Sequence, residues 1–202
     1  MGLRLGAKLC EPYQCPCGAK VGPAGTHGLA CRRSAGRTTR HHALNDLVSR
    51  AIGRANIPAV KEPVGLLRSD GKRPDGLTRI SWQTGKCMIW DATVTDALAE
   101  LYLLATSSTA GAAAEGAADR KELKYQSFAH TLTFNPMAFE TFGPINSKSV
   151  DFFNTLGRCI SACTGDMRET AFLFQRLSLT IQRFNAVCFN RSFCFKNADL
   201  DS

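Results

Sequence analysis

The sequence lacks any long apolar run. No stretch approaches the roughly 20 residues that a membrane-spanning helix needs, so we expect no integral membrane protein. The first residues, MGLRLGAKLCEPY, include basic side chains but no apolar core of a signal peptide. We therefore expect an intracellular location rather than secretion.

A disulfide framework is also not expected. The chain has nine cysteines, but an odd count without a signal peptide favours reduced thiols, some of them binding metal. No internal repeat is visible, and at 202 residues with 44% hydrophobic residues the chain can bury a core of its own. We expect one domain with a small appendage.

Positive charge is concentrated in the front of the chain. Residues 1–80 hold 14 Lys and Arg against 5 Asp and Glu, a balance of +9, and the rest hold 11 against 12, a balance of −1. This asymmetry predicts a surface for a polyanion, although a solvated basic surface would give the same count.

Periodicity divides the chain into a head at 1–36 with a basic linker, a domain at 37–190 and a frayed tail at 191–202. The head has no helical period, whereas the residues from 40 to about 53 have apolar side chains at helical spacing. Expected strands are 58–63, 77–82, 86–95 and 132–142, the last bulged or at an edge because it contains Pro136. Further helices are expected at 109–128, at 147–163 and from Asp166 onward.

The head has the residues of a zinc site. In CPCGAKVGPAGTHGLAC, the candidate ligands are Cys15, Cys17, His27 and Cys31, with Cys10 as a substitute. Three thiolates and one imidazole form a tetrahedral structural zinc set, which a short loop-rich segment needs in order to fold. Scattered reduced cysteines are the alternative.

Arginines follow this head at positions 32, 33, 37 and 40. A guanidinium can donate two hydrogen bonds to one phosphate, so these side chains suit DNA-backbone contacts. The alternative is that they only solubilise the linker.

Two acids lie in GKRPDGLTRISWQTGKCMIWDATVTD. Asp75 follows a proline, and Asp91 interrupts the apolar run Cys87 to Trp90. A buried carboxylate is costly without a partner, so Asp91 should face a site. Two carboxylates on adjacent strands can hold Mg²⁺ for phosphodiester hydrolysis. A turn-capping role is the alternative for each acid.

The expected α/β order, αβββαβ followed by two helices, resembles the PD-(D/E)xK nuclease core. The joint occurrence of CPCG…HGLAC, RHHALND, GKRPD and WDATV resembles the restriction-endonuclease-like tail of early-branching non-LTR retrotransposon polyproteins. There, a Cys-Cys-His-Cys zinc knuckle and an Arg-His motif precede the nuclease.

The resemblance implies roles for single residues. Arg40 and His41 match the Arg-His pair near DNA, Asp75 and Asp91 are the metal-binding catalytic acids, and Glu62 is a third acid. Lys72 and Arg73 complete the expected DNA-binding set with Arg32, Arg33 and Arg37. His41 could position a phosphate or assist proton transfer, although a structural histidine is the alternative.

The sequence departs from the motif at its lysine, because Thr93 stands two residues after Asp91. Family members draw the lysine from the next helix, where RKELKYQ offers Lys121 and Lys124 on one face. We predict Lys124 as the catalytic lysine.

These observations predict a Mg²⁺-dependent DNA-nicking endonuclease domain of retrotransposon origin, with structural zinc and a nuclear location. DNA is the expected partner, with the element's RNA as a second one. A catalytically inactive zinc-containing DNA-binding module on the same fold is the alternative, and a docking domain built on the apolar C-terminal helices is a weaker one.

Overall fold

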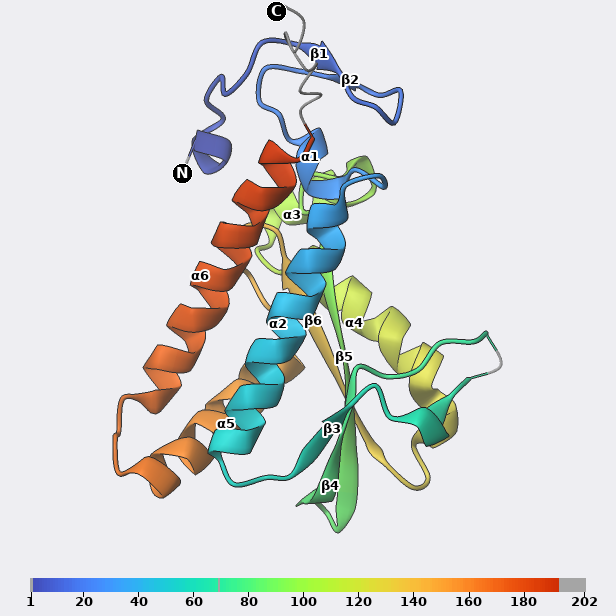
Figure 1. Cartoon of the computed structure of the whole chain (residues 1–202), viewed down its shortest axis with the longest axis vertical. Coiled ribbons are helices and arrows are strands. Elements are labelled where there is room, and N and C mark those ends of the chain that lie inside the picture. Colours follow the sequence, from blue (N-terminus) through green and yellow to red (C-terminus); the bar gives the residue numbers. More distant parts are fainter. Residues whose placement is uncertain (1, 69, 193–202) are drawn as a thin grey trace, which may run out of the picture.

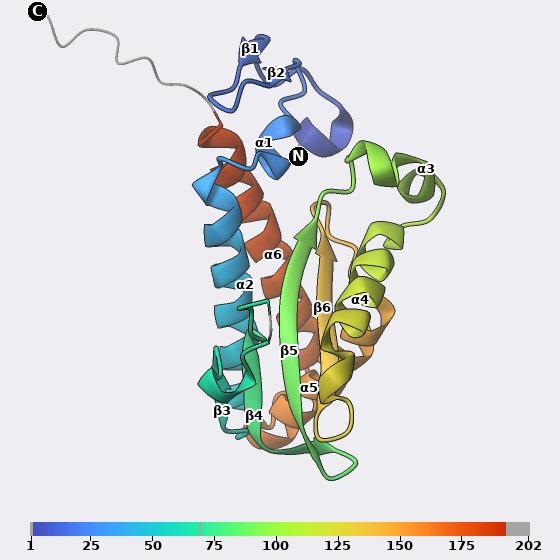
Figure 2. The ribbon, with the colours of Figure 1, turned by 90° about the vertical axis from the view of Figure 1, so that its right-hand side faces the viewer.

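The computed structural model describes residues 2–68 and 70–192. A mixed sheet of four strands forms the central layer of the main domain, and helices cover both of its faces (Figures 1 and 2). The Cys/His head lies at one end of the molecule, above the helical layer (Figure 1). The α/β class predicted from the sequence is confirmed at this level.

The sheet has the order β3-β4-β5-β6. Its strands are β3 (Ala59–Lys61), β4 (Gly76–Gln83), β5 (Lys86–Thr95) and β6 (Thr133–Glu140). The first three are antiparallel, and β6 runs parallel to β5. All four expected strands are therefore present, and the prediction of an edge position for the strand with Pro136 is confirmed.

The helices of the domain are α2 (Ala35–Arg54), α3 (Glu100–Ser108), α4 (Ala112–Tyr125), α5 (Ser147–Thr164) and α6 (Glu169–Asn190). Helices α2 and α6 lie side by side and run in opposite directions (Figure 1). Helix α3 was not expected, because its leucines do not form one buried face: Leu101 and Leu104 are both exposed. Helix α6 begins at Glu169 rather than at Asp166, whose carboxylate accepts a hydrogen bond from the Arg168 backbone N–H.

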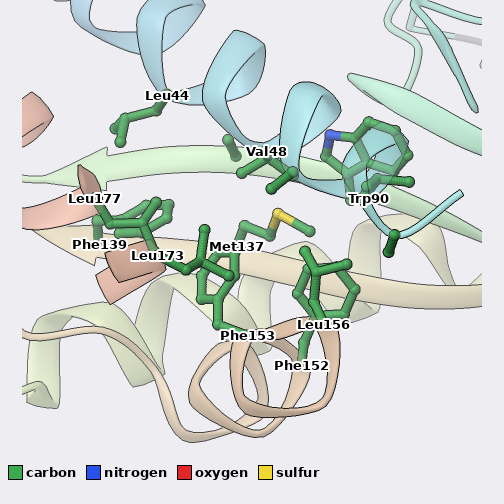
Figure 3. Close-up of a cluster of buried hydrophobic side chains, with 14 of the residues drawn as sticks. Leu44, Val48, Trp90, Met137, Phe139, Phe152, Phe153, Leu156, Leu173 and Leu177 are labelled. Carbon is green, nitrogen blue, oxygen red and sulfur yellow. The ribbon is translucent and has the colours of Figure 1, made fainter. Parts of the chain in front are cut away.

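The main core lies between the sheet and the layer formed by α2, α5 and α6 (Figure 3). Alternation along β5 points Met88, Trp90 and Ala92 into this core. The residues between them therefore point to the opposite face, against which α4 packs its alanines, Ala114, Ala117 and Ala118. Asp91 belongs to this second set, which places a carboxylate on the α4 side of the sheet.

Trp90 fixes the start of β4 against β5. Its indole N–H donates to the Asn45 side-chain oxygen over 2.9 Å, and its ring crosses Gly76. A Cβ at Gly76 would lie only 2.0 Å from the ring, so no larger residue fits there without displacement. The Pro-Asp-Gly step thus ends in a glycine that lets the strand approach Trp90 and places Asp75 beside β5.

Candidate active site and metal centre

The four predicted zinc ligands meet in the head. A short hairpin of β1 (Tyr13–Gln14) and β2 (Lys20–Val21) carries Cys15 and Cys17, and α1 (His27–Ala30) carries His27 and leads into Cys31. One ligand atom from each of the four residues lies within 4.8 Å of all the others. This group could hold a metal ion and is consistent with zinc.

The separations within the group fit a tetrahedral centre. The Cys15 and Cys31 sulfurs are 3.6 Å apart, and the Cys17 sulfur is 3.2 Å from His27 Nε2. Tetrahedral ligands at bond lengths near 2.3 Å lie about 3.7 Å apart. Burial raises the pKa of Cys15 to about 11, so a bound cation would be needed to hold it as a thiolate near neutral pH. Cys10 lies outside the group and contacts the carbonyl oxygens of Gly22 and Pro23.

The head is attached to the helical layer by specific contacts. The Tyr13 hydroxyl and the Ser192 Oγ are 2.6 Å apart, and the Arg40 guanidinium donates to the Leu29 carbonyl over 3.2 Å. Gly36 lies directly against the backbone of Cys188 on α6. The metal group therefore sits at a fixed place above the start of α2.

Asp75 is held from several sides. Its backbone N–H donates to the Trp90 carbonyl over 2.9 Å, and its carboxylate Oδ2 accepts the Ala92 backbone N–H over 2.6 Å. Its own carbonyl accepts a backbone N–H from Glu62 over 2.9 Å and a longer bond from Asn45. The carboxylate has a defined position next to β5.

His41 reaches the same carboxylate from α2. Its Nε2 lies 3.1 Å from Asp75 Oδ1. The hydrogen bond to Asp75 raises the pKa of His41, against the lowering effect of burial, and the Asp91 charge adds to the rise. The pair is a histidine whose ring orientation and protonation are set by an acid, the arrangement used in general acid–base catalysis.

Asp91 is only 5% exposed, so the prediction of a buried carboxylate on this strand is confirmed. Lys121 of α4 lies 2.7 Å from Asp91 Oδ2, with 22% of its side chain exposed. Tyr125, one turn further along α4, is fully buried. Burial, followed by the proximity of Asp91, raises the pKa of Tyr125 well above its ordinary value. The two acids are thus approached from opposite layers, by His41 from α2 and by Lys121 from α4.

The predicted choice between the two lysines of α4 requires a correction. Lys121, not Lys124, forms the ion pair with Asp91. The Lys124 ammonium instead lies 5.3 Å from the Tyr125 ring centre, and burial followed by repulsion from Lys121 lowers its pKa. Residues i and i+3 are close but point about 60° apart around a helix, and that angle decides which lysine meets the acid.

Two further predicted residues have other partners. Glu62 is exposed and forms an ion pair with Arg73 at the surface, so its side chain does not join the two acids. Arg40 is only 2% exposed and donates to the Asn185 side-chain oxygen over 2.7 Å as well as to Leu29. Arg40 is therefore not the exposed surface residue that was predicted, and its side chain ties the head to α2 and α6.

The other predicted DNA-binding residues are exposed at the surface: Arg32, Arg33, Arg37, Lys72 and Arg73. Arg33 donates to the Pro16 carbonyl over 2.6 Å, and Arg37 to the Ala30 carbonyl over 3.2 Å. These four arginines and one lysine remain available for contacts outside the chain. Arg73 also forms an ion pair with Glu62.

Arg68 belongs to the site and was missed. Its guanidinium carbon lies 5.2 Å from the centre of the Tyr125 ring. Both Arg68 Nη1 and the Tyr125 hydroxyl are buried without a hydrogen bond of standard geometry to any described residue. Arg68 comes from the loop between β3 and β4, and no periodic pattern in the sequence links that loop to α4.

Within residues 2–68 and 70–192, no group of three or more metal-ligating side chains other than the head group comes as close together. Likewise, no helix in those ranges is both long and apolar enough to cross a membrane. In comparisons with known proteins, neither a family model nor a curated protein matches the chain.

Proposed function

We propose that this protein is a metal-dependent DNA endonuclease that nicks one strand by phosphodiester hydrolysis. The observation that carries the proposal is the joint environment of Asp75 and Asp91. Two carboxylates lie at adjacent strands, and a histidine and a lysine approach them from opposite sides. The charges of Asp91 and Lys121 both act on the pKa of His41, and an acid, a base and a cation in one neighbourhood form a set suited to phosphoryl chemistry.

The arrangement of elements supports the same proposal. Helix α2, strands β3 to β5, helix α4 and strand β6 follow one another in the order αβββαβ, with α3 inserted before α4. This is the order that the resemblance to the PD-(D/E)xK nucleases implies, with the Pro-Asp step directly before β4 and the second acid on the neighbouring β5.

The two acids are suitable ligands for Mg²⁺. Hard carboxylate oxygens are the donors this ion prefers, and it needs only one or two of them with water and phosphate oxygens. Each carboxylate has about four lone-pair positions, and the described hydrogen bonds use only some of them on Asp75 and Asp91. When bound, the ion would supply charge stabilisation for phosphodiester cleavage.

The chain's own side chains have distinct tasks in this proposal. His41 takes or gives a proton at Nε2, and Asp75 holds its ring in place. Lys121 brings positive charge to the Asp91 side, where negative charge develops on the phosphate. Arg68 packs over the Tyr125 ring on that side of the site.

The exposed arginines of the head and linker would bind the DNA backbone, with zinc holding the head in shape. RNA has the same backbone charge, so the element's RNA remains a second ligand in this proposal. Binding through phosphates should weaken steeply as salt is added.

One observation favours a second function, a DNA-binding module without catalysis. Lys121 already neutralises Asp91 in the structure, and Thr93 stands at the position of the motif lysine. An internal ion pair of this kind can replace a metal ion and keep the fold intact.

A plasmid-nicking assay separates the two functions. Zinc-loaded protein is incubated with supercoiled plasmid in Mg²⁺ or Mn²⁺, and the variants are Asp75→Asn, Asp91→Asn and the matched control Asp119→Asn, an exposed acid of α4. The enzyme proposal predicts nicking by the wild type and the control alone. DNA binding by all four proteins with nicking by none would establish the module instead.

A further inference from the structure

A polar hollow of about 390 Å³ lies where the head joins α2, next to the end of β5. Its lining includes Arg32, Arg37 and Thr38 from the head and the first turn of α2, and Thr93 from β5. His41 also borders it. No acidic side chain lines the hollow, so its charge is entirely positive.

Two buried polar atoms in the wall of this hollow have no partner. Ser34 is 7% exposed and Arg40 is 2% exposed, and both line the hollow. The Ser34 Oγ and the Arg40 Nε make no hydrogen bond to any residue that the structure describes. An unpaired buried polar group costs about 1–3 kcal/mol, so these atoms indicate a ligand that accepts hydrogen bonds.

Hydrogen bonds hold the Arg40 guanidinium in a fixed orientation at the wall of the hollow. Its two terminal nitrogens donate to Asn185 and Leu29, which fixes the plane of the guanidinium. The Nε is the one guanidinium nitrogen without a hydrogen bond to a described residue.

The start of α2 adds to the positive potential. Ser34 is the N-cap residue, but its side chain makes no capping hydrogen bond, and the first turn has no acidic residue. The Arg37 N–H donates to the Ser34 carbonyl over 3.1 Å, so the backbone N–H groups of Ala35 and Gly36 are the ones left to bind an anion, as helix N-termini commonly do.

We propose that this hollow binds one phosphate group of a nucleic-acid strand. Ser34 and Arg40 donate from the inner wall, Arg32 and Arg37 contribute charge at the rim, and the Thr38 and Thr93 hydroxyls complete the set. The site itself follows from the geometry, and only the identification of the phosphate as a nucleic-acid phosphate rests on the proposed function. The phosphate would lie beside the His41–Asp75 pair, so the hollow would position the strand for cleavage.

In this proposal Thr93 contributes to phosphate binding. A lysine at this position would put a flexible cation into the hollow, whereas threonine leaves room and offers a hydroxyl. The residue that departs from the nuclease motif would be part of a phosphate subsite.

The test is a titration of ¹⁵N-labelled, zinc-loaded protein with inorganic phosphate, followed by NMR. We expect saturable shifts of the Arg40 Nε–H and of the backbone N–H groups of Ala35 and Gly36. Thr93→Glu, which puts a carboxylate into the hollow, should abolish these shifts, and the size-matched Thr93→Val, which removes only the hydroxyl, should weaken phosphate binding without abolishing the shifts. Shifts that do not saturate, or that persist in Thr93→Glu, overturn the proposal.

A second arm identifies the source of the phosphate. Binding of a fluorescent DNA duplex is measured by anisotropy in Mg²⁺-free buffer for Arg37→Gln and for Arg33→Gln, a neighbouring arginine that does not line the hollow. Loss of a charge-assisted hydrogen bond should weaken DNA binding about tenfold in Arg37→Gln, with a smaller loss in Arg33→Gln. Equal losses in the two variants, together with saturable phosphate shifts, would mean a free phosphate ligand and overturn the nucleic-acid assignment.

The outcomes also separate this site from the proposed enzyme. Asp91→Asn should keep the phosphate shifts, because Asp91 does not line the hollow. Saturable shifts without nicking in any metal would leave the phosphate site and remove the nuclease. Nicking by Thr93→Glu at the wild-type rate, with no phosphate shift in any variant, would leave the nuclease and remove the phosphate site.

Discussion

The two predicted metal sites of this protein are built in opposite ways. In the head, four soft ligands converge with nothing between them. In the domain, Asp75 and Asp91 are each paired with a basic side chain of the protein. The head is expected to depend on a bound ion for its shape, whereas the acidic pair is positioned by the packing of the sheet and would take its ion together with the substrate.

Loss of zinc from the head should have the largest effect. We expect Cys31→Ser to lose about one zinc per chain and the folded head, because structural zinc contributes about 10–16 kcal/mol in small zinc modules. Zinc content and circular dichroism measure the two effects. Cys10→Ser is the control, since Cys10 contacts only backbone carbonyls, and full zinc retention in Cys31→Ser would contradict the assignment.

The lysines of α4 test the acidic pair. We expect Lys121→Gln to slow nicking about 100-fold, a typical loss for one positioned electrostatic group, because Lys121 contacts Asp91. Lys124→Gln, one turn away and pointing to Tyr125, should change the rate far less. The nicking rate at saturating Mg²⁺ decides between them, and a reversed order would return the catalytic role to Lys124.

Disturbing the packing of the sheet should destabilise the domain and leave the head unchanged. Gly76→Ala forces a Cβ into the Trp90 ring, and such overpacking costs about 1–3 kcal/mol. Chemical denaturation measures this loss, and zinc content should stay unchanged. Gly53→Ala is the matched control: its Cβ would meet open space in α2, so we expect a gain of up to about 1 kcal/mol. Equal stability of the two variants would contradict the described packing.

The smallest expected effect is on the pKa of His41. Asp75 raises the pKa of His41, so the pair stabilises the fold fully below about pH 6.5, the ordinary histidine value. That stabilisation disappears as the pH rises through the raised pKa. In Mg²⁺-free buffer, NMR titration should show a lower His41 pKa in Asp75→Asn and no change in Asp70→Asn. An unchanged His41 in Asp75→Asn would show that the pair does not form.

Local patterns in the sequence predicted much of this molecule. Alternation and turn residues located β4 and β5, and the chemistry of an acid inside an apolar strand located Asp91. What failed were contacts set by tertiary packing. The angular position around α4 places Lys121 rather than Lys124 against Asp91. Arg40 is buried where the head packs on α6. The loop between β3 and β4 places Arg68 over the Tyr125 ring. Residues 193–202, part of the predicted frayed tail, lie outside the described residues.

The central claim is that Asp75 and Asp91 hold one divalent cation between them. Electron paramagnetic resonance of Mn²⁺ added to zinc-loaded protein and a short DNA duplex counts that ion once the Mn²⁺ bound by the duplex alone is subtracted. We expect one bound Mn²⁺ in the wild type and in Asp119→Asn, and none in Asp75→Asn or Asp91→Asn at the same concentration. Bound Mn²⁺ that survives in both acid variants, or its absence from the wild type, would contradict it.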